Sequence, residues 1–164
     1  MLSPVLALVL PQLVPIADAY CEGGASATTN FGSSNTLIVK SVGGTGDLRY
    51  TRSSWLGFDV RNQPPAMPGA TLLLTPRSNR VENQAGPHVV RLYGLREAAD
   101  QWSERSIHWN NAPGNDRTSS YLDPEAVILL DSRRVASLTA GTPLALGGPK
   151  LGQFVQDDTD GIVT

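Results

Sequence analysis

The sequence is poor in the residues that most often build disulfide-bonded or metal-centred sites. It contains one cysteine, Cys21, and two histidines among 164 residues. A single cysteine allows no intrachain disulfide and no cysteine-based zinc site, and two imidazoles cannot supply a three-histidine site. A lone cysteine at strand spacing is usually a small hydrophobe, so we expect Cys21 to be buried.

Charge is also scarce, because Asp, Glu, Lys and Arg make up 17% of the chain and the formal net charge is −2. No block of Lys or Arg runs along the sequence. Duplex nucleic acid requires several phosphate-neutralising side chains on one face, so we predict no nucleic-acid partner. The sequence also has no nucleophile elbow and no glycine-rich phosphate loop, so we predict that the protein is not an enzyme.

Residues 1–15 form an apolar N-terminal segment that Pro11 and Pro15 interrupt. The segment is too short to span a bilayer, so we predict no membrane insertion. It lacks the positive n-region of a signal peptide, although Ala17-Asp18-Ala19 mimics a cleavage site. Two interpretations stay open, a degraded or clipped signal region and a linker.

Sixteen glycines and twelve prolines predict many turns and few long helices in the rest of the chain. Short runs of β-forming residues lie between these turns. The predicted strands are 18–21, 36–41, 48–60, 70–75, 88–95, 106–109, 127–131, 143–146 and 161–164. Short helical turns are predicted over 96–102 and 151–156. This pattern predicts an antiparallel all-β sandwich with no helix longer than about four turns.

Alternation within the longer strands predicts which side chains face the core, because successive residues of a strand point to opposite faces. The residues predicted to be buried are Leu56, Phe58, Val60, Leu72, Leu74, Val90 and Leu92. By the same alternation, Lys40, Thr71 and Arg91 are predicted to face outward.

Four segments resemble a known family in their order and residues. The first contains Asp18-Ala19-Tyr20, Gly23-Gly24 and Thr29-Asn30-Phe31-Gly32-Ser33-Ser34-Asn35-Thr36-Leu37-Ile38-Val39-Lys40; the others are Arg52-Ser53-Ser54-Trp55-Leu56-Gly57-Phe58-Asp59-Val60, Ala70-Thr71-Leu72-Leu73-Leu74 and Trp102-Ser103-Glu104-Arg105-Ser106-Ile107-His108-Trp109-Asn110-Asn111-Ala112-Pro113. Together they resemble the DNRLRE-type domains, also called carbohydrate-binding module family 96. The resemblance covers residues 16–164.

The resemblance implies a jelly-roll-like β-sandwich on a secreted, extracellular bacterial protein. It also implies polysaccharide as the partner and covalently linked domains, often polysaccharide lyases or hydrolases. Some members of the family bind alginate, an acidic polysaccharide. The closing strand of the family pattern is absent, and Gly161 to Thr164 has the pattern of a strand cut in its middle. We therefore expect a C-terminally truncated domain with an unpaired edge or a groove near these residues.

Four residues are candidates for carbohydrate binding. If Leu56, Phe58 and Val60 face the core, Trp55 faces outward, where its indole suits the apolar face of a pyranose. Lys40, Arg91 and Tyr93 alternate outward on their own strands, and arginine can bind uronate carboxylates through two hydrogen bonds. These side chains form one basic and aromatic patch only if their strands are neighbours. The alternative is that Trp55 lies under a loop and the charges are solvated.

Two further motifs favour structural roles. Trp102 and Trp109 are predicted to anchor the loop that they flank, with Asn110 and Asn111 as turn formers. Residues 157–161, Asp-Asp-Thr-Asp-Gly, predict a polar turn, with a structural calcium ion as the alternative and no other cofactor.

The first functional hypothesis is therefore a non-catalytic polysaccharide-binding module of a secreted protein. The alternative is a structural spacer or adhesion module of a surface protein with no sugar site. The strands of a sandwich are the same in both cases, so the sequence does not separate the two.

Overall fold

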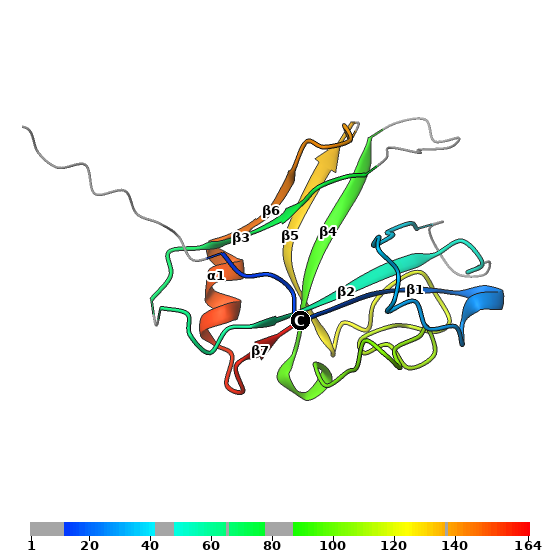
Figure 1. The fold of residues 1–164 in the computed structure, drawn as a ribbon, viewed down its shortest axis with the longest axis horizontal. Coiled ribbons are helices and arrows are strands. Elements are labelled where there is room, and N and C mark those ends of the chain that lie inside the picture. The colour runs from blue at the N-terminus through cyan, green and yellow to red at the C-terminus, as the bar shows by residue number, and fades with distance from the viewer. Residues whose placement is uncertain (1–11, 42–47, 65, 78–86, 137) are drawn as a thin grey trace, which may run out of the picture.

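The fold is all-β, with antiparallel strands and one short α-helix (Figure 1). A computed structural model of the chain describes residues 12–41, 48–64, 66–77, 87–136 and 138–164. Its strands are β1 (Ala17–Glu22), β2 (Arg52–Asp59), β3 (Ala70–Leu74), β4 (His88–Leu95), β5 (Val127–Val135), β6 (Leu144–Gly148) and β7 (Ile162–Val163). The helix α1 spans Pro149–Gln156, and two single-turn 3-10 helices span Gly24–Ser26 and Glu97–Ala99.

The strands form three hydrogen-bonded groups, ordered β1-β2-β7, β3-β6 and β4-β5. Every pair is antiparallel, which is consistent with the predicted all-β sandwich. The ribbons β3-β6 and β4-β5 lie side by side, and α1 packs against β3, β5 and β6 (Figure 1). The helix is eight residues long, in agreement with the prediction of short helical turns only. Among the described helices, none is long and apolar enough to cross a membrane.

The tightly packed core lies where the three-stranded sheet meets the base of the β4-β5 ribbon and the 107–112 loop. Its buried members are Ala19, Cys21, Trp55, Leu95, Ile107, Trp109, Ala112 and Val127. Cys21 is fully buried, as the sequence predicts, and burial raises the pKa of its thiol to about 12. The thiol is therefore protonated and unreactive at neutral pH.

The predicted alternation is right on two strands. On β3 and β4, Leu72, Leu74, Val90 and Leu92 are the less exposed set, although they are half-buried rather than buried. Thr71 and Arg91 are exposed, as predicted. The final predicted core residue of the 48–60 segment, Val60, is buried as well.

On β2 the predicted facing is wrong. Trp55 is only 5% exposed and Gly57 is buried, whereas Leu56 and Phe58 are half-buried. The register with β1 explains the reversal, because Trp55 lies opposite Ala19 and Gly57 opposite Ala17. Small side chains on this face leave room for a large indole, which therefore takes the core position. Its N–H donates to the Pro113 carbonyl at 3.1 Å, so the polar atom of the ring is also satisfied.

Two predicted strands are not formed. Of residues 36–41, only Lys40 makes a β-bridge, with Arg52. Ser34 holds a turn through bonds to Thr36, and the Ser54 hydroxyl donates to the Ile38 carbonyl in place of a backbone ladder. Residues 106–109 lie in turns. The Ile107 N–H donates to the Ser103 carbonyl, and the Ala112 N–H donates to the His108 carbonyl.

The Trp102–Pro113 loop has the structural role predicted for it. Trp109 is buried in the core, and Trp102 is half-buried with its N–H donating to the Thr164 hydroxyl at 3.0 Å. The Asn111 side chain accepts from the His108 N–H and donates to the Ser106 carbonyl, as a turn former does.

The last strand, β7, is paired rather than open. Phe58 and Asp59 of β2 lie opposite Val163 and Ile162, and the Thr164 carbonyl accepts from the Leu95 N–H at 2.7 Å. A groove lies beside β7, and α1 forms its far wall.

Candidate functional site

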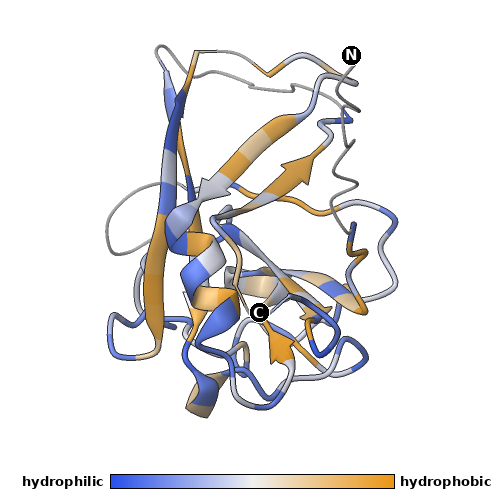
Figure 2. Ribbon diagram, turned by 90° about the vertical axis from the view of Figure 1, so that its left-hand side faces the viewer, coloured by the Kyte–Doolittle hydropathy of each residue, from blue (hydrophilic) through white to orange (hydrophobic). Residues whose placement is uncertain are grey.

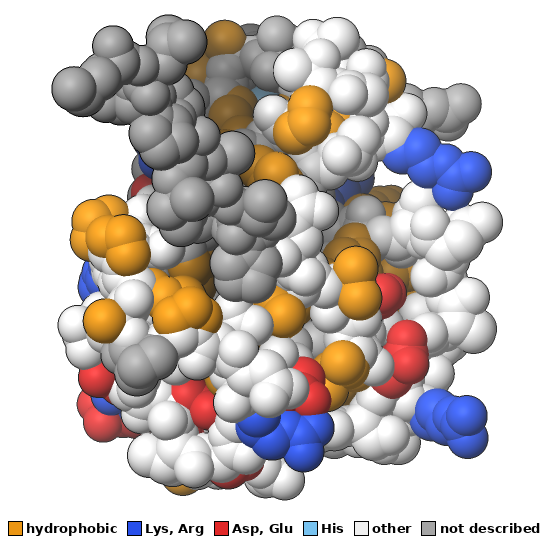
Figure 3. All heavy atoms as spheres, turned by 60° about the vertical axis from the view of Figure 1, so that its left-hand side comes forward, with side chains coloured by type: hydrophobic (Ala, Val, Ile, Leu, Met, Phe, Trp, Pro, Cys, Tyr) orange, Lys and Arg blue, Asp and Glu red, His pale blue; other side chains and the backbone are white. Residues whose placement is uncertain are grey.

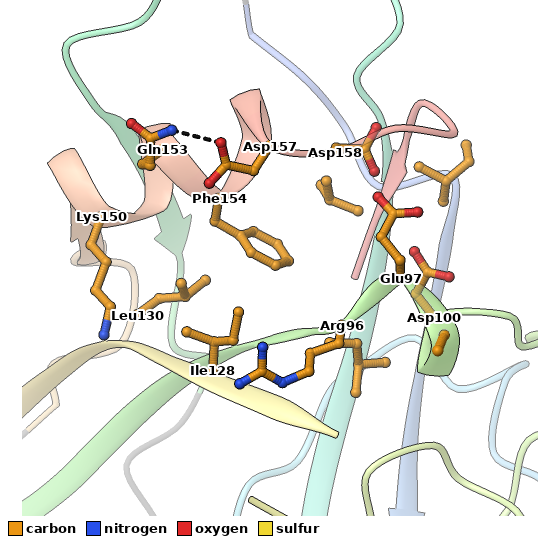
Figure 4. A pocket seen from close by; sticks show the side chains of 14 residues that line it. Arg96, Glu97, Asp100, Ile128, Leu130, Lys150, Gln153, Phe154, Asp157 and Asp158 are labelled. Carbon is orange, nitrogen blue, oxygen red and sulfur yellow. Dashed lines mark hydrogen bonds between the residues drawn. The ribbon is translucent and has the colours of Figure 1, made fainter. Parts of the chain in front are cut away.

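The groove between α1, β7 and the base of the β4-β5 ribbon encloses about 510 Å³. Its floor is apolar and consists of Leu95, Ile128, Leu130, Ile162 and Val163. Leu95, Leu130 and Val163 are buried, so the floor is fixed by the packing of three different strands. Phe154 projects from α1 into the groove, with polar side chains around the rim (Figure 4).

The position of the Phe154 ring depends on Gly94 of β4. A Cβ atom on Gly94 would lie 2.5 Å from the ring, closer than real Cβ atoms approach their neighbours. Glycine therefore lets the tip of the ring rest directly on the β4 backbone. The ring extends from α1 toward the β4-β5 ribbon, as Figure 4 shows.

The two ends of β5 differ in polarity, and it is the apolar end that lines the groove. Val127–Leu130 is apolar and contributes to the core and the groove, whereas Asp131–Arg134 is polar and extends beyond them (Figure 2). Lys150 of α1 donates a hydrogen bond to the Leu129 carbonyl, which ties the helix to this strand.

On the side seen in Figure 3, acidic side chains lie among scattered hydrophobic ones over the lower half of the surface.

Four carboxylates gather at the β7 end of the groove. Glu97, Asp100, Asp158 and Asp160 each offer an oxygen within 4.8 Å of the others. Backbone N–H groups hold three of them, since Thr159 donates to Glu97, Gly161 to Asp158 and Ile162 to Asp160. These are hard oxygen ligands of the kind that calcium prefers. Asp157 from the same predicted turn stands apart and accepts from Gln153 at 2.7 Å.

Burial and mutual repulsion raise the pKa values of Asp100 and Asp158. Desolvation is the larger cause for both, and the nearby carboxylates of Asp160 and Glu97 add to it. A carboxyl whose folded-state pKa is raised destabilises the fold above that pKa, and the cost disappears as the pH falls through it. The pKa of Asp59 is shifted in the opposite direction. Hydrogen bonds from Arg61 lower it to about 2, so the stabilisation that ionised Asp59 gives is lost as the pH falls toward 2.

Replacing one exposed carboxylate of this cluster should therefore stabilise the protein at neutral pH. We expect Asp160→Asn to raise the melting temperature at pH 7 by a few degrees, because it removes a charge that disfavours ionised Asp100 and Asp158. The gain should shrink as the pH falls toward about 4, where carboxyl groups begin to protonate. Asp18→Asn removes the same charge on β1, outside the cluster, and is the matched control. A gain that is independent of pH, or equal in both variants, would contradict this account.

The structure separates the four residues predicted to bind carbohydrate. Trp55 is buried in the core, so the expectation that its ring faces solvent is wrong. Lys40 is exposed, with its ammonium 5.0 Å from the centre of the Tyr50 ring. Arg91 and Tyr93 lie on β4, which pairs with β5 and not with β2, so the four residues do not share one sheet.

Two residues that the sequence did not single out accompany the predicted ones. Tyr50 is 51% exposed and lies under Lys40. Arg134 is exposed on β5, and its partner across the ribbon is Val89, two residues from Arg91. Tyr50 lies within the predicted strand 48–60 but outside β2, and its position next to Lys40 depends on the fold. Arg134 lies beyond Asp131, where the strand is predicted to end. Residues 131–134, Asp-Ser-Arg-Arg, are not β-formers, so the sequence carries no signal that the strand continues to Val135.

The antiparallel strands and the core shared between sheet and ribbon define an all-β, sandwich-like module. The model of carbohydrate-binding module family 96 matches residues 10–126, and the chain belongs to this family. The match ends before β5, so it does not extend to Thr164 as the resemblance in the sequence did. No curated protein matches the chain.

Proposed function

We propose that the chain is a non-catalytic polysaccharide-binding module of a secreted protein, and that its ligand is an acidic polysaccharide such as alginate. Membership of the family supports carbohydrate binding, since such modules generally bind sugars without cleaving them. By holding a linked catalytic or surface domain on its polymer, the module raises the local concentration of that domain.

The observation that carries the proposal is a pair of arginines on the outer face of the β4-β5 ribbon. Arg91 lies opposite Ser132, and Arg134 lies opposite Val89, which makes the two arginines diagonal neighbours on one face. Both side chains are exposed, and among the described residues neither forms an ion pair. Two like charges this close repel each other, so an anion bound between them relieves a cost.

Guanidinium groups suit the carboxylates of a polyuronate. Each can donate two parallel hydrogen bonds to one carboxylate, a geometry that lysine cannot supply. Tyr93 lies two residues beyond Arg91 on the same strand and is half-buried against the core. Lys40 and Tyr50 offer a second place for an acidic sugar, with an exposed ring and an adjacent ammonium.

Removing either arginine should weaken binding of a polyuronate. We expect Arg91→Ala and Arg134→Ala each to lower affinity by about 1.4- to fivefold, because exposed charge contacts are worth roughly 0.2–1 kcal/mol. The double variant should lose more, and the losses should shrink at high salt, which screens exposed charges beyond about 8 Å at physiological ionic strength. The measurement is titration of alginate into each variant at two salt concentrations.

Two further variants make this test specific. Arg105→Ala removes an exposed arginine from a loop outside the ribbon and should leave affinity unchanged. Arg91→Lys keeps the charge, so partial loss would show that the two-bond geometry matters. Wild-type affinity in the folded double variant would place the site elsewhere. No affinity of the wild type for any acidic polymer would favour the spacer or adhesion module.

A further inference from the structure

We propose that the α1 groove is a further carbohydrate subsite, and that it takes an uncharged pyranose rather than a uronate. The inference rests on the proposed function only in that the ligand is a sugar. It concerns a different surface, because the groove is lined by the α1 side of the β4-β5 ribbon, whereas Arg91 and Arg134 do not line it. Most of the groove's lining also comes from β5, α1, β7 and the turn between α1 and β7, beyond the 10–126 segment that the family model matches.

The size and rigidity of the groove fit a small ligand. Its volume of about 510 Å³ lies within the roughly 300–1,000 Å³ typical of small-molecule sites. Buried strand residues form the floor, and α1 is fastened to β5 and β3 by packing and by the Lys150 bond to Leu129. Such a site is formed before the ligand arrives, which reduces the entropic cost of binding.

The Phe154 ring gives the groove a surface on which a sugar can stack. The tip of the ring rests on Gly94, which has no Cβ, and the ring projects from α1 into the groove that it lines (Figure 4). The C–H face of a pyranose is apolar and can pack against an aromatic ring, while its hydroxyls remain at the edge. The apolar floor below and the polar rim above match this two-sided character of a sugar.

The charges of the rim decide between neutral and acidic sugars. Arg96 and Lys150 are the basic residues of the lining, against the four acidic residues Glu97, Asp100, Asp157 and Asp158. A uronate carboxylate here would meet an excess of negative charge. Sugar hydroxyls, in contrast, donate to carboxylates in charge-assisted hydrogen bonds. Gln153 adds an amide at the helix side of the rim.

The test is calorimetric titration of the full chain with three neutral oligosaccharides, namely xylohexaose, cellohexaose and mannohexaose, and with an oligouronate. We expect at least one neutral oligosaccharide to bind, and Phe154→Ala to weaken it about tenfold, which corresponds to about 1.4 kcal/mol. Phe154→Leu keeps apolar volume and should also weaken binding, because it removes the flat ring. Arg91→Ala should leave neutral-sugar binding unchanged.

A second measurement needs no substitution in the groove. Addition of the bound neutral oligosaccharide to labelled wild type should shift the amide resonances of Gly94, Leu95 and Ile128. Shifts confined to the outer face of the β4-β5 ribbon would overturn the subsite, as would unchanged neutral-sugar affinity in folded Phe154→Ala. If no neutral sugar bound, the proposed subsite would also be overturned. If the chain then proved to form a dimer that buries α1, the groove would be a protein–protein interface instead. Loss of oligouronate binding in the arginine variants tests the other surface independently.

Discussion

Trp55→Ala is expected to lower the free energy of unfolding by about 3–5 kcal/mol, the usual cost of truncating a buried aromatic side chain. For a chain of this length that corresponds to a fall in melting temperature of roughly 6–20 °C. The indole lies in the core with Ala19, Cys21 and Trp109, and its loss leaves a cavity that these neighbours cannot fill. The Pro113 carbonyl also loses its hydrogen-bond donor. Thermal and denaturant unfolding measure the effect.

Two controls separate the parts of this effect. Trp55→Phe keeps an aromatic ring and removes the N–H, so it should cost about 1 kcal/mol for the hydrogen bond plus a smaller packing loss. Leu56→Ala alters the half-buried opposite face of β2 and should cost less than Trp55→Ala. If Trp55→Ala melted like wild type but bound polysaccharide weakly, the indole would be on the surface and the register of β2 with β1 would be wrong.

Gly32→Ala is the second substitution with a large expected effect. A Cβ atom at Gly32 would lie 1.9 Å from the Glu104 carbonyl oxygen, which is a backbone atom and cannot turn away. The backbone must therefore shift, at a cost of about 3 kcal/mol or more, the upper part of the range for overpacked sites. Ser33→Ala, at the exposed neighbouring residue, should leave the melting temperature nearly unchanged. Equal melting temperatures for the two variants would contradict the close approach.

The contact around Gly32 joins the first and the fourth of the segments that resemble the family. The Asn30 amide donates to the Glu104 and Ile107 carbonyls at 2.8 and 2.7 Å, so the 29–32 loop is fastened to the 102–113 loop. Ile107 and Trp109 then fill the core beneath them. These residues therefore hold the two loops together. The surfaces proposed to bind sugar use other residues.

The difference between right and wrong facing predictions has a simple physical origin. On β4, Val90 and Leu92 alternate with an arginine, so only one face can be buried. On β2, both faces offer apolar or small residues, and alternation gives two sets without saying which is inside. The neighbouring strand β1 decides which face of β2 is buried. On β1, the small Ala19 and Cys21 alternate with the more polar Asp18, Tyr20 and Glu22. Only the pairing of β1 with β2 places these small residues beside Trp55.

The sequence by itself determined the all-β class, the short helix, most strand positions, the buried cysteine and the family, because these depend on local propensity, periodicity and short motifs. The tertiary structure alone decided which face of β2 is buried, and it brought Arg134 beside Arg91 across the ribbon. It also gathered Glu97, Asp100, Asp158 and Asp160 from two distant loops, and set Phe154 upon Gly94. Each of these features depends on the register between segments far apart in the chain. Register is fixed by the packing of both partners together, so neither segment carries it alone.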